Sequence, residues 1–405
     1  MSPSLPSTRN ARQALDREGL IEFTCRLVRV PSVNRPGDAF GEANAVAVVV
    51  EQAAAFGWDV LVEEVAPGRP NAIIRLEGGL PGPTLLFEGH TDVVTEGNSD
   101  DWAFDPFGGD IVDGKIRGRG AADMKGGVAA IMFAARAIQE AGPFPGTIIL
   151  AILCDEEEMM IGVHDFVEKG HAAGVDGAIV AEPEGGEVCA VQKGAIRLRV
   201  DLDGTMSHGA MPHQGDNPIV AAGMLMAALA EIEAGLQDAH GEHPHLGWPY
   251  ITPTHIVAGS LPQFNVIPER ALLTFDIRTT PGIDHDELVG EIRRRADGIT
   301  ADTGVAFTLS RPVDRPATDT PLDDPVVRAV AEAHTAVTGD APVYGGVPGT
   351  TDGTILWRDA GLPVVVYGPG GKWIAHQKDE FVEIDDLVTS TEVFIEAALR
   401  FLTGA

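Results

Sequence analysis

The stretch Leu85–Val94, which reads LLFEGHTDVV, decides both the fold and the site. Its apolar residues lead into Gly89 and His90, a pattern typical of a buried strand that presents a histidine at its carboxyl end. Asp92 follows two residues later and could fix the tautomer of a metal-binding imidazole. A histidine near a strand end is more often structural than metal-binding, so this interpretation depends on finding the pattern again.

The same pattern recurs after three further apolar runs. In chain order, the runs and the polar residues after them are Ile148–Cys154 with Asp155 to Glu158, Ala178–Ala181 with Glu182, and Val364–Tyr367 with a glycine-rich turn and His376. Active sites of open α/β sheets lie outside the carboxyl ends of the strands. Adjacent carboxylates at such an end repel one another, and a bound cation is the simplest way to hold them together.

A glycine-rich stretch, Gly118–Gly127, opens a predicted helix whose apolar face includes Val128 and Ile131. Asp123 stands at or near the expected N-cap of this helix. Aspartate often does no more than cap a helix. The surrounding glycines, however, let the backbone approach another group closely, which favours a site.

Five candidate metal ligands therefore emerge. They are His90, Asp123, Glu157, Glu182 and His376. Two imidazoles and three carboxylates suit two divalent ions of the zinc type that share one bridging carboxylate. Glu156, beside a predicted ligand, is then free to act as a general base.

Length and the order of the predicted elements indicate a divided chain. With 405 residues, at least two domains are expected. In the first part of the chain, predicted helices at 14–30 and 42–57 are followed by strands and then by a further helix, and this order favours an α/β sandwich. From residue 192 to about 310, a strand, a long apolar helix and further strands indicate an inserted α+β domain. The predicted domains are a catalytic domain in two parts, 1–191 and 311–405, and the insert at 192–310.

The composition limits the partners and the compartment. The chain has 29 Lys and Arg against 60 Asp and Glu, a net charge of −31, and no basic cluster. Nucleic acid and anionic membranes are therefore not expected as partners, and an anionic substrate needs a local cationic anchor. Three scattered cysteines indicate a reducing compartment. The segment Met1–Leu15 shows no signal-peptide core and no run approaches the ~18 apolar residues of a membrane helix, so a soluble cytoplasmic protein is expected.

The ordered motifs GHTDVV, GRGAADMKGG, DEE, AEP and AHQKDEFV resemble those of the co-catalytic zinc hydrolases. This family includes aminoacylases, acetylornithine deacetylase, succinyl-diaminopimelate desuccinylase and glutamate carboxypeptidase. The resemblance runs from about Leu15 to the C-terminus. It implies an α/β fold, with a mixed-sheet α/β/α catalytic domain and an inserted α+β domain that serves as lid and homodimer interface.

The resemblance also implies roles for the candidate residues. They are His90 and Glu182 on one metal, Glu157 and His376 on the second, Asp123 as the bridge, Asp92 as the group that orients His90, and Glu156 as the general base. The ions implied are two Zn²⁺, with Co²⁺ or Mn²⁺ as alternatives. Because three glutamates are consecutive, a shift by one residue would make Glu157 the base and Glu158 the ligand.

Within the insert, the motif GTMSHGAMP resembles the family's lid motif, and His208 would then stabilise a substrate oxyanion. Asn265, in FNVIP, and Arg278, in FDIR, match positions that hold a substrate carboxylate. Without the family, Arg278 would more often be a solvated strand residue. The insert contains several further histidines, namely His213, His240, His243, His245 and His255. They could form a second metal site, although ordinary loop histidines are the simpler interpretation.

Two stretches near the end of the chain complete the expected site. Thr351, in GTTDG, resembles the family's substrate loop, but Gly353 stands where some members carry Ala followed by Arg, which weakens any claim to their substrate. Gly370 lies in a turn expected to bring backbone close to the substrate.

The function implied is metal-assisted hydrolysis of the amide bond of an N-acyl amino acid, as in a deacetylase or desuccinylase, to a carboxylate and a free amino acid. A di- or tripeptidase or a carboxypeptidase of the same family is the alternative, with a short peptide as substrate. A catalytically inactive binding protein is a third reading, and it predicts a missing ligand or base.

Overall fold

The computed structural model describes residues 7–35 and 41–404. The chain divides into two compact units, each described here by itself. Unit 1 comprises residues 1–190, 320–347 and 351–405, and unit 2 comprises residues 191–319 and 348–350. Of the N-terminal stretch Met1–Leu15, in which no signal peptide is expected, the first six residues lie outside the described part.

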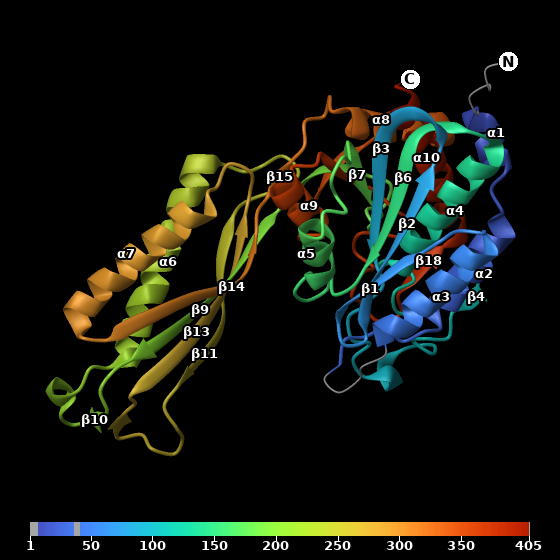
Figure 1. The fold of residues 1–405 in the computed structure, drawn as a ribbon. Coiled ribbons are helices and arrows are strands. Elements are labelled where there is room, and N and C mark those ends of the chain that lie inside the picture. Colours follow the sequence, from blue (N-terminus) through green and yellow to red (C-terminus); the bar gives the residue numbers. More distant parts are fainter. Residues whose placement is uncertain (1–6, 36–40, 405) are drawn as a thin grey trace. The chain divides into compact units, whose positions relative to one another are not determined.

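Among the described residues, the largest sheet has nine strands and forms the centre of unit 1 (Figure 1). Its strands, in spatial order, are β1 (Leu61–Ala66), β2 (Arg69–Glu77), β6 (Phe144–Leu153), β3 (Gly79–His90), β7 (Gly177–Val180), β17 (Val364–Val366), β8 (Val188–Gln192) and β15 (Thr318–Asp319), with β16 (Tyr344–Val347) also paired to β8. The four central strands β6, β3, β7 and β17 run parallel to their neighbours within this group. Their carboxyl ends therefore meet at one edge of the sheet.

Burial on both faces explains the continuous apolar runs of these strands. Along β3, Leu85 and Phe87 enter one hydrophobic core, and Leu86 enters a second core on the opposite face. The first face is covered by α1 (Thr8–Gln13), α2 (Arg17–Val28), α3 (Gly41–Ala55), α4 (Lys125–Ala141), α8 (Pro325–Thr338) and α10 (Ile384–Thr403). The second is covered by α5 (Ile161–Glu168) and α9 (Gly353–Ala360). The expected α/β/α arrangement with a mixed sheet is confirmed.

Smaller elements complete unit 1. A three-stranded sheet joins β18 (Phe381–Glu383), β5 (Lys115–Arg117) and β4 (Asp110–Val112), and η1 (Ser99–Asp101) precedes it in the chain.

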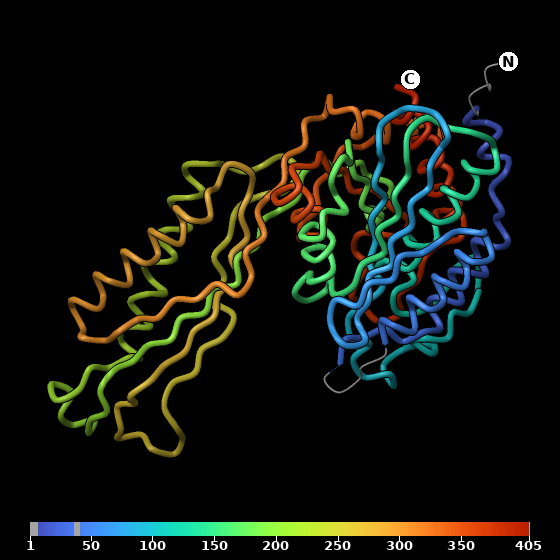
Figure 2. Tube along the Cα trace, in the orientation of Figure 1, coloured from blue at the N-terminus to red at the C-terminus, as the bar shows by residue number. Residues whose placement is uncertain are grey.

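Unit 2 is built on a four-stranded antiparallel sheet whose trace can be followed in Figure 2. Its strands lie in the order β11 (Tyr250–Ala258), β13 (Arg270–Thr279), β9 (Gly194–Asp203) and β14 (Ala306–Arg315). Two helices, α6 (Pro218–His240) and α7 (His285–Thr303), pack on one face of this sheet through a third core. A two-stranded ribbon of β10 (Ser207–His208) and β12 (Val266–Ile267) and a short helix, η2 (Pro212–Gln214), complete the unit.

Helix α6 corrects one expectation from the sequence. By length and composition it is apolar enough to cross a membrane, although no segment was expected to approach that criterion. One face packs into the core of unit 2, with Leu225 and Leu229 among the buried residues, but only 28% of the apolar window is buried. Ile219 and Val220 of the same helix are exposed.

Candidate metal centre

The candidate centre lies where the parallel strands of unit 1 end. His90 is the last residue of β3. Glu156 and Glu157 follow the end of β6, and Glu182 follows the end of β7. Because β3 pairs in parallel with both β6 and β7, these ends are neighbours. The topology alone thus brings together side chains that are up to 92 residues apart in sequence, from position 90 to position 182.

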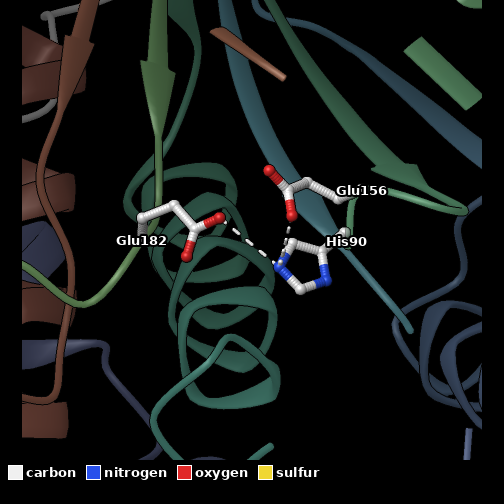
Figure 3. A group of neighbouring side chains, drawn as sticks. All are labelled: His90, Glu156 and Glu182. Atoms are coloured by element: carbon white, nitrogen blue, oxygen red, sulfur yellow. Dashed lines mark ion pairs between the residues drawn. The ribbon is translucent and has the colours of Figure 1, made fainter. Parts of the chain in front are cut away.

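One group of carboxylates surrounds the His90 imidazole, which is fully buried. Figure 3 shows Glu156 and Glu182 with their carboxylates turned toward the same ring nitrogen. The Nε2 atom lies 3.4 Å from Glu182 Oε1, 3.3 Å from Asp123 Oδ1 and 4.0 Å from Glu156 Oε2. None of these contacts has the geometry of a hydrogen bond, so Nε2 is a buried nitrogen without a hydrogen-bond partner among the described residues.

A second group forms around His376, which is half exposed. Its Nε2 atom lies 3.2 Å from Asp123 Oδ2 and 3.0 Å from Glu157 Oε2. The two carboxylate oxygens of Asp123 therefore face two different imidazoles, one on each side.

These distances fit a pair of metal ions. Ligand atoms bound to zinc at about 2.0–2.1 Å in tetrahedral geometry lie about 3.3 Å apart, close to the separations around His90 and His376. Overlapping groups of possible ligands include His90 with Glu156 and Glu182, and His90 with Asp123 and Glu157. The donor set contains only nitrogen and carboxylate oxygen, as borderline divalent ions accept.

Asp92 lies behind His90 and holds the neighbouring segment as well. The His90 Nδ1 atom is 2.9 Å from the backbone carbonyl oxygen of Asp92 and 3.5 Å from its carboxylate Oδ1. That carboxylate accepts hydrogen bonds from the backbone N–H groups of Glu156 and Glu157, at 3.2 and 3.1 Å. The carboxylate of Asp92 was expected to orient His90, but the carbonyl oxygen of Asp92 is the atom closer to the ring. The carboxylate also holds the backbone of Glu156 and Glu157.

Asp123 is positioned by a residue that the sequence did not reveal. Helix α4 begins at Lys125 with Met124 at the N-cap, so Asp123 precedes the cap and its side chain is free of a capping role. Glu380 accepts hydrogen bonds from the backbone N–H groups of Ala122 and Asp123, at 3.0 and 3.1 Å, and pairs with the buried Arg119. The separation of 257 residues between Glu380 and Asp123 leaves no local signal for this contact.

Gly127, in the glycine-rich stretch Gly118–Gly127, has no room for a side chain. A Cβ atom on Gly127 would lie 2.1 Å from the carbonyl oxygen of Ala181, the residue before Glu182. Only glycine allows the first turn of α4 to pack this closely against the segment that carries Glu182.

Burial and the close approach of several charges shift the pKa values of the titratable groups in this centre. Burial raises the pKa of Glu156 well above its usual range, and the nearby charges of Glu182 and Glu157 add to this. Burial, followed by the charge of Asp123, raises the pKa of Glu182 to about 8. The carboxylates of Asp123 and Glu157 raise the pKa of His376 to about 10. A cation between these carboxylates would relieve the repulsion that protons otherwise relieve.

The residues predicted from the insert belong to unit 2. Pairing of β10 with β12 places His208 opposite Val266, and the Gly209 N–H donates to the carbonyl of Asn265 at 2.7 Å. His208 and Asn265 are therefore neighbours. Arg278 lies on β13 and donates to Asp276 through Nε and Nη2, at 2.7 and 3.2 Å.

Thr351 and Gly370 belong to unit 1 and are held by the protein itself. The Thr351 Oγ1 atom accepts a hydrogen bond from the N–H of Gly353 at the start of α9. The Gly370 N–H donates to Asp386 at 2.7 Å, and its carbonyl accepts from the Gly185 N–H at 2.9 Å. Their expected substrate contacts stay predictions.

A further cluster close by in the sequence was also missed. Its possible ligand atoms lie close enough together to hold a metal ion, and they belong to Glu184, Glu187 and Cys189. The ammonium of Lys372 already lies among them, 2.6 Å from Glu184 and 2.8 Å from Glu187. This lysine ties the loop that carries His376 to the segment after Glu182, so the cluster supports the centre.

Comparison with known proteins decides the family. The sequence pattern of Peptidase family M20/M25/M40 matches residues 86–400. The chain belongs to this family. It is 35% identical over 391 residues to the succinyl-diaminopimelate desuccinylase of Methylobacterium radiotolerans, covering 94% of this chain and 96% of the relative. The desuccinylase of Rhodospirillum centenum is 34% identical over 394 residues, with coverages of 94% and 96%.

Solved structures show the same fold. An M20 family metallo-carboxypeptidase from Sulfolobus solfataricus superposes with a TM-score of 0.77 at 20% identity, covering 95% of this chain and 98% of that one. A dinuclear metal-binding M20 peptidase from Bacillus subtilis gives 0.72 at 21% identity, with coverages of 96% and 99%. With the family established, the protein is a metal-dependent hydrolase that acts on amide bonds.

Proposed function

We propose that the protein hydrolyses the amide bond of N-acyl amino acids, with N-succinyl amino acids as the first class to test. The observation that carries the chemistry is the position of Asp123, whose two carboxylate oxygens face His90 and His376 at 3.3 and 3.2 Å. The names of the relatives, succinyl-diaminopimelate desuccinylases, support the acyl group.

Two divalent ions, with Zn²⁺ first and Co²⁺ or Mn²⁺ as alternatives, would be held in this centre. His90, Asp123 and Glu182 would hold one, and Asp123, Glu157 and His376 the other. The chemistry that bound ions supply is Lewis acidity toward the scissile carbonyl and a water of lowered pKa.

Glu156 carries the proton in this proposal. Its carboxylate accepts a proton from the attacking water and later gives it to the nitrogen of the leaving amino acid. Asp92 holds the backbone of Glu156 and the ring of His90, so it acts as a positioning residue.

Unit 2 would supply the substrate contacts. His208 would donate to the oxyanion of the tetrahedral intermediate, and Asn265 and Arg278 would bind a substrate carboxylate. Thr351 and Gly370 would line the substrate from unit 1.

We further propose a homodimer formed through unit 2, in the cytoplasm. A hollow on unit 2 is lined by apolar side chains, among them Met206, Ile219 and Phe264, together with charged ones such as Asp203 and Arg270. Phe264 is 89% exposed, which is unusual for a phenylalanine unless a partner covers it.

The first experiment measures metal content and turnover together. The purified, dialysed protein should hold about two ions per chain and should hydrolyse one class in a panel of N-succinyl, N-acetyl and N-formyl amino acids and dipeptides. Preference for the dipeptides would establish the peptidase alternative. Two ions with no turnover on any member would contradict the proposed substrate class, and no metal after addition of zinc, cobalt or manganese would overturn the centre.

The variant Glu156→Gln tests the proton carrier. It should retain both ions and lose turnover by roughly 10²- to 10⁴-fold, because the amide cannot accept the proton of the water. Glu158→Gln is the matched control, since Glu158 is exposed and accepts a hydrogen bond from Asn34 at 2.7 Å. If Glu158→Gln lost metal and Glu156→Gln kept its turnover, the register shifted by one residue would be correct.

A further inference from the structure

Lys193 is a buried cation without an acidic partner. It lies between β8 and β9 in unit 2, and only 7% of its surface is exposed. Its Nζ atom donates to the backbone carbonyl of Trp248 at 2.8 Å and lies 4.9 Å from the centre of the Tyr250 ring. Among residues 7–35 and 41–404, no carboxylate forms an ion pair with it. A buried ammonium without a counter-charge is costly, and it is unexpected in a chain with 60 acidic residues.

A second cation, Arg278, lies on the same face of the same sheet. The antiparallel register places Arg278 opposite Tyr250 on one side and opposite Ala195 on the other. Ala195 is two residues beyond Lys193, so the side chains of Lys193 and Arg278 share the face that α6 and α7 leave open. Burial lowers the pKa of Lys193, and the positive charge of Arg278 lowers it further.

The donors that remain define the ligand. Arg278 is held by Asp276 through Nε and Nη2, which leaves Nη1 for another acceptor. Lys193 uses one of its three N–H bonds on the Trp248 carbonyl. A third cation, Arg197, lies on the same face with its Nε atom 3.8 Å from Asp276 Oδ2. Three cations and the one carboxylate of Asp276 leave a net charge of about +2, which favours a carboxylate ligand.

We propose that Lys193 and Arg278 together bind one carboxylate group of the substrate, with Lys193 as the specificity residue that has no other counter-charge. This inference deepens the proposed function and rests on it. It explains how a chain of net charge −31 binds an acidic substrate. It also distinguishes Lys193 from Arg199, on the same face of β9, which is neutralised by two bonds of 2.8 Å to Asp201.

A purely structural role for Lys193 makes a different prediction. If the lysine only fixed the Trp248 carbonyl, its loss would lower kcat/KM equally for substrates with and without the carboxylate. The test therefore compares an N-succinyl amino acid with its two monoamides, one blocked at the α-carboxylate and one at the succinyl carboxylate.

The experiment compares the wild type with three variants, each as the metal-loaded full chain. The variants are Lys193→Met, Lys193→Arg and Arg199→Met. In the wild type, one of the two monoamides should be a much poorer substrate than the diacid. Lys193→Met should reduce that preference by roughly ten- to a hundredfold through KM, the usual effect of losing one hydrogen bond to a charged group. Lys193→Arg should restore most of the preference, and Arg199→Met should leave it unchanged. Unchanged preferences in Lys193→Met would overturn the proposal.

Binding of succinate, measured by calorimetry, keeps the test independent of turnover. Lys193→Met should weaken succinate binding by roughly tenfold or more, and the double variant with Arg278→Met should lose less than the product of the two single losses, because both side chains contact one group. This pattern without turnover of any acyl amino acid would support the anion site and refute the proposed reaction. Succinate binding equal to wild type would refute the anion site even if deacylation were found.

Discussion

Replacing Glu380 by glutamine should destabilise unit 1 and weaken its metal centre. Glu380 and Arg119 are both buried, with exposures of 0% and 2%. The glutamine keeps an oxygen for the N–H groups of Ala122 and Asp123, but it places an uncharged amide against the guanidinium. The substitution thus removes one charge and leaves the geometry nearly intact.

The magnitude follows from the contacts of Arg119. Removing one partner of a buried ion pair costs about 3–5 kcal/mol, because the other charge stays buried. Arg119 keeps a hydrogen bond to the Thr95 carbonyl at 3.3 Å and a position 5.2 Å from the Trp102 ring. These contacts place the loss at the lower end of that range, about 3 kcal/mol, which is roughly a hundredfold in the folded-to-unfolded ratio. Loosening of the Asp123 backbone should lower metal affinity by roughly 10- to 100-fold.

Urea unfolding followed by tryptophan fluorescence, with a competition assay for zinc, measures both effects. Glu140→Gln is the control, since Glu140 forms an exposed pair with Arg136 at 2.7 Å and should cost less than about 1 kcal/mol. The double variant Glu380→Met with Arg119→Met should be more stable than either single variant, because no charge is then left unpaired. A loss no larger than that of Glu140→Gln, or a double variant with the summed loss of both singles, would refute this account.

Two further predictions concern metal and pH. Chelation should lower the thermal midpoint, since a ligand at 1,000 times its Kd stabilises the folded state by about 4 kcal/mol; calorimetry with and without chelator measures this, and an unchanged midpoint would contradict the centre. Succinate affinity should fall as pH rises through the pKa of Lys193, which burial and Arg278 lower, because the ammonium is charged only below that pKa. The fall should therefore begin below the pH of about 10.4 at which an ordinary lysine titrates, and Lys193→Arg should abolish it, because arginine stays charged.

Much of the centre could be predicted because its signal is local. Three of the five candidate ligands, His90, Glu157 and Glu182, lie at the end of a buried strand or within four residues of it. Asp123 instead precedes helix α4, and His376 follows β17 by ten residues. Parallel pairing then brings the ends together without further information. The α/β fold was predictable for the same reason, since strands buried on both faces must be covered by helices.

The contacts that support the centre could not be predicted in this way. Glu380 contacts Arg119 and Asp123 across more than 250 residues, and a glutamate in a polar loop carries no local signal. Lys193 is a similar case, because what distinguishes it is the absence of a partner, which appears only once the chain is folded. The apolar length of α6 was underestimated because the acidic residues of the helix interrupt its runs.

The two imidazoles differ in their access to solvent, and this sets an order for metal exchange. The His90 side chain is fully buried at the end of a central strand, whereas the His376 side chain is 55% exposed on a loop. An ion leaves when its ligands can swing aside and water can enter, which is far easier at His376. Under limiting chelator the population should therefore pass through a species with a single ion held at His90. When metal is added back, the position at His376 should be the last to fill. When metal is scarce, this more accessible position should be the first to lose its ion.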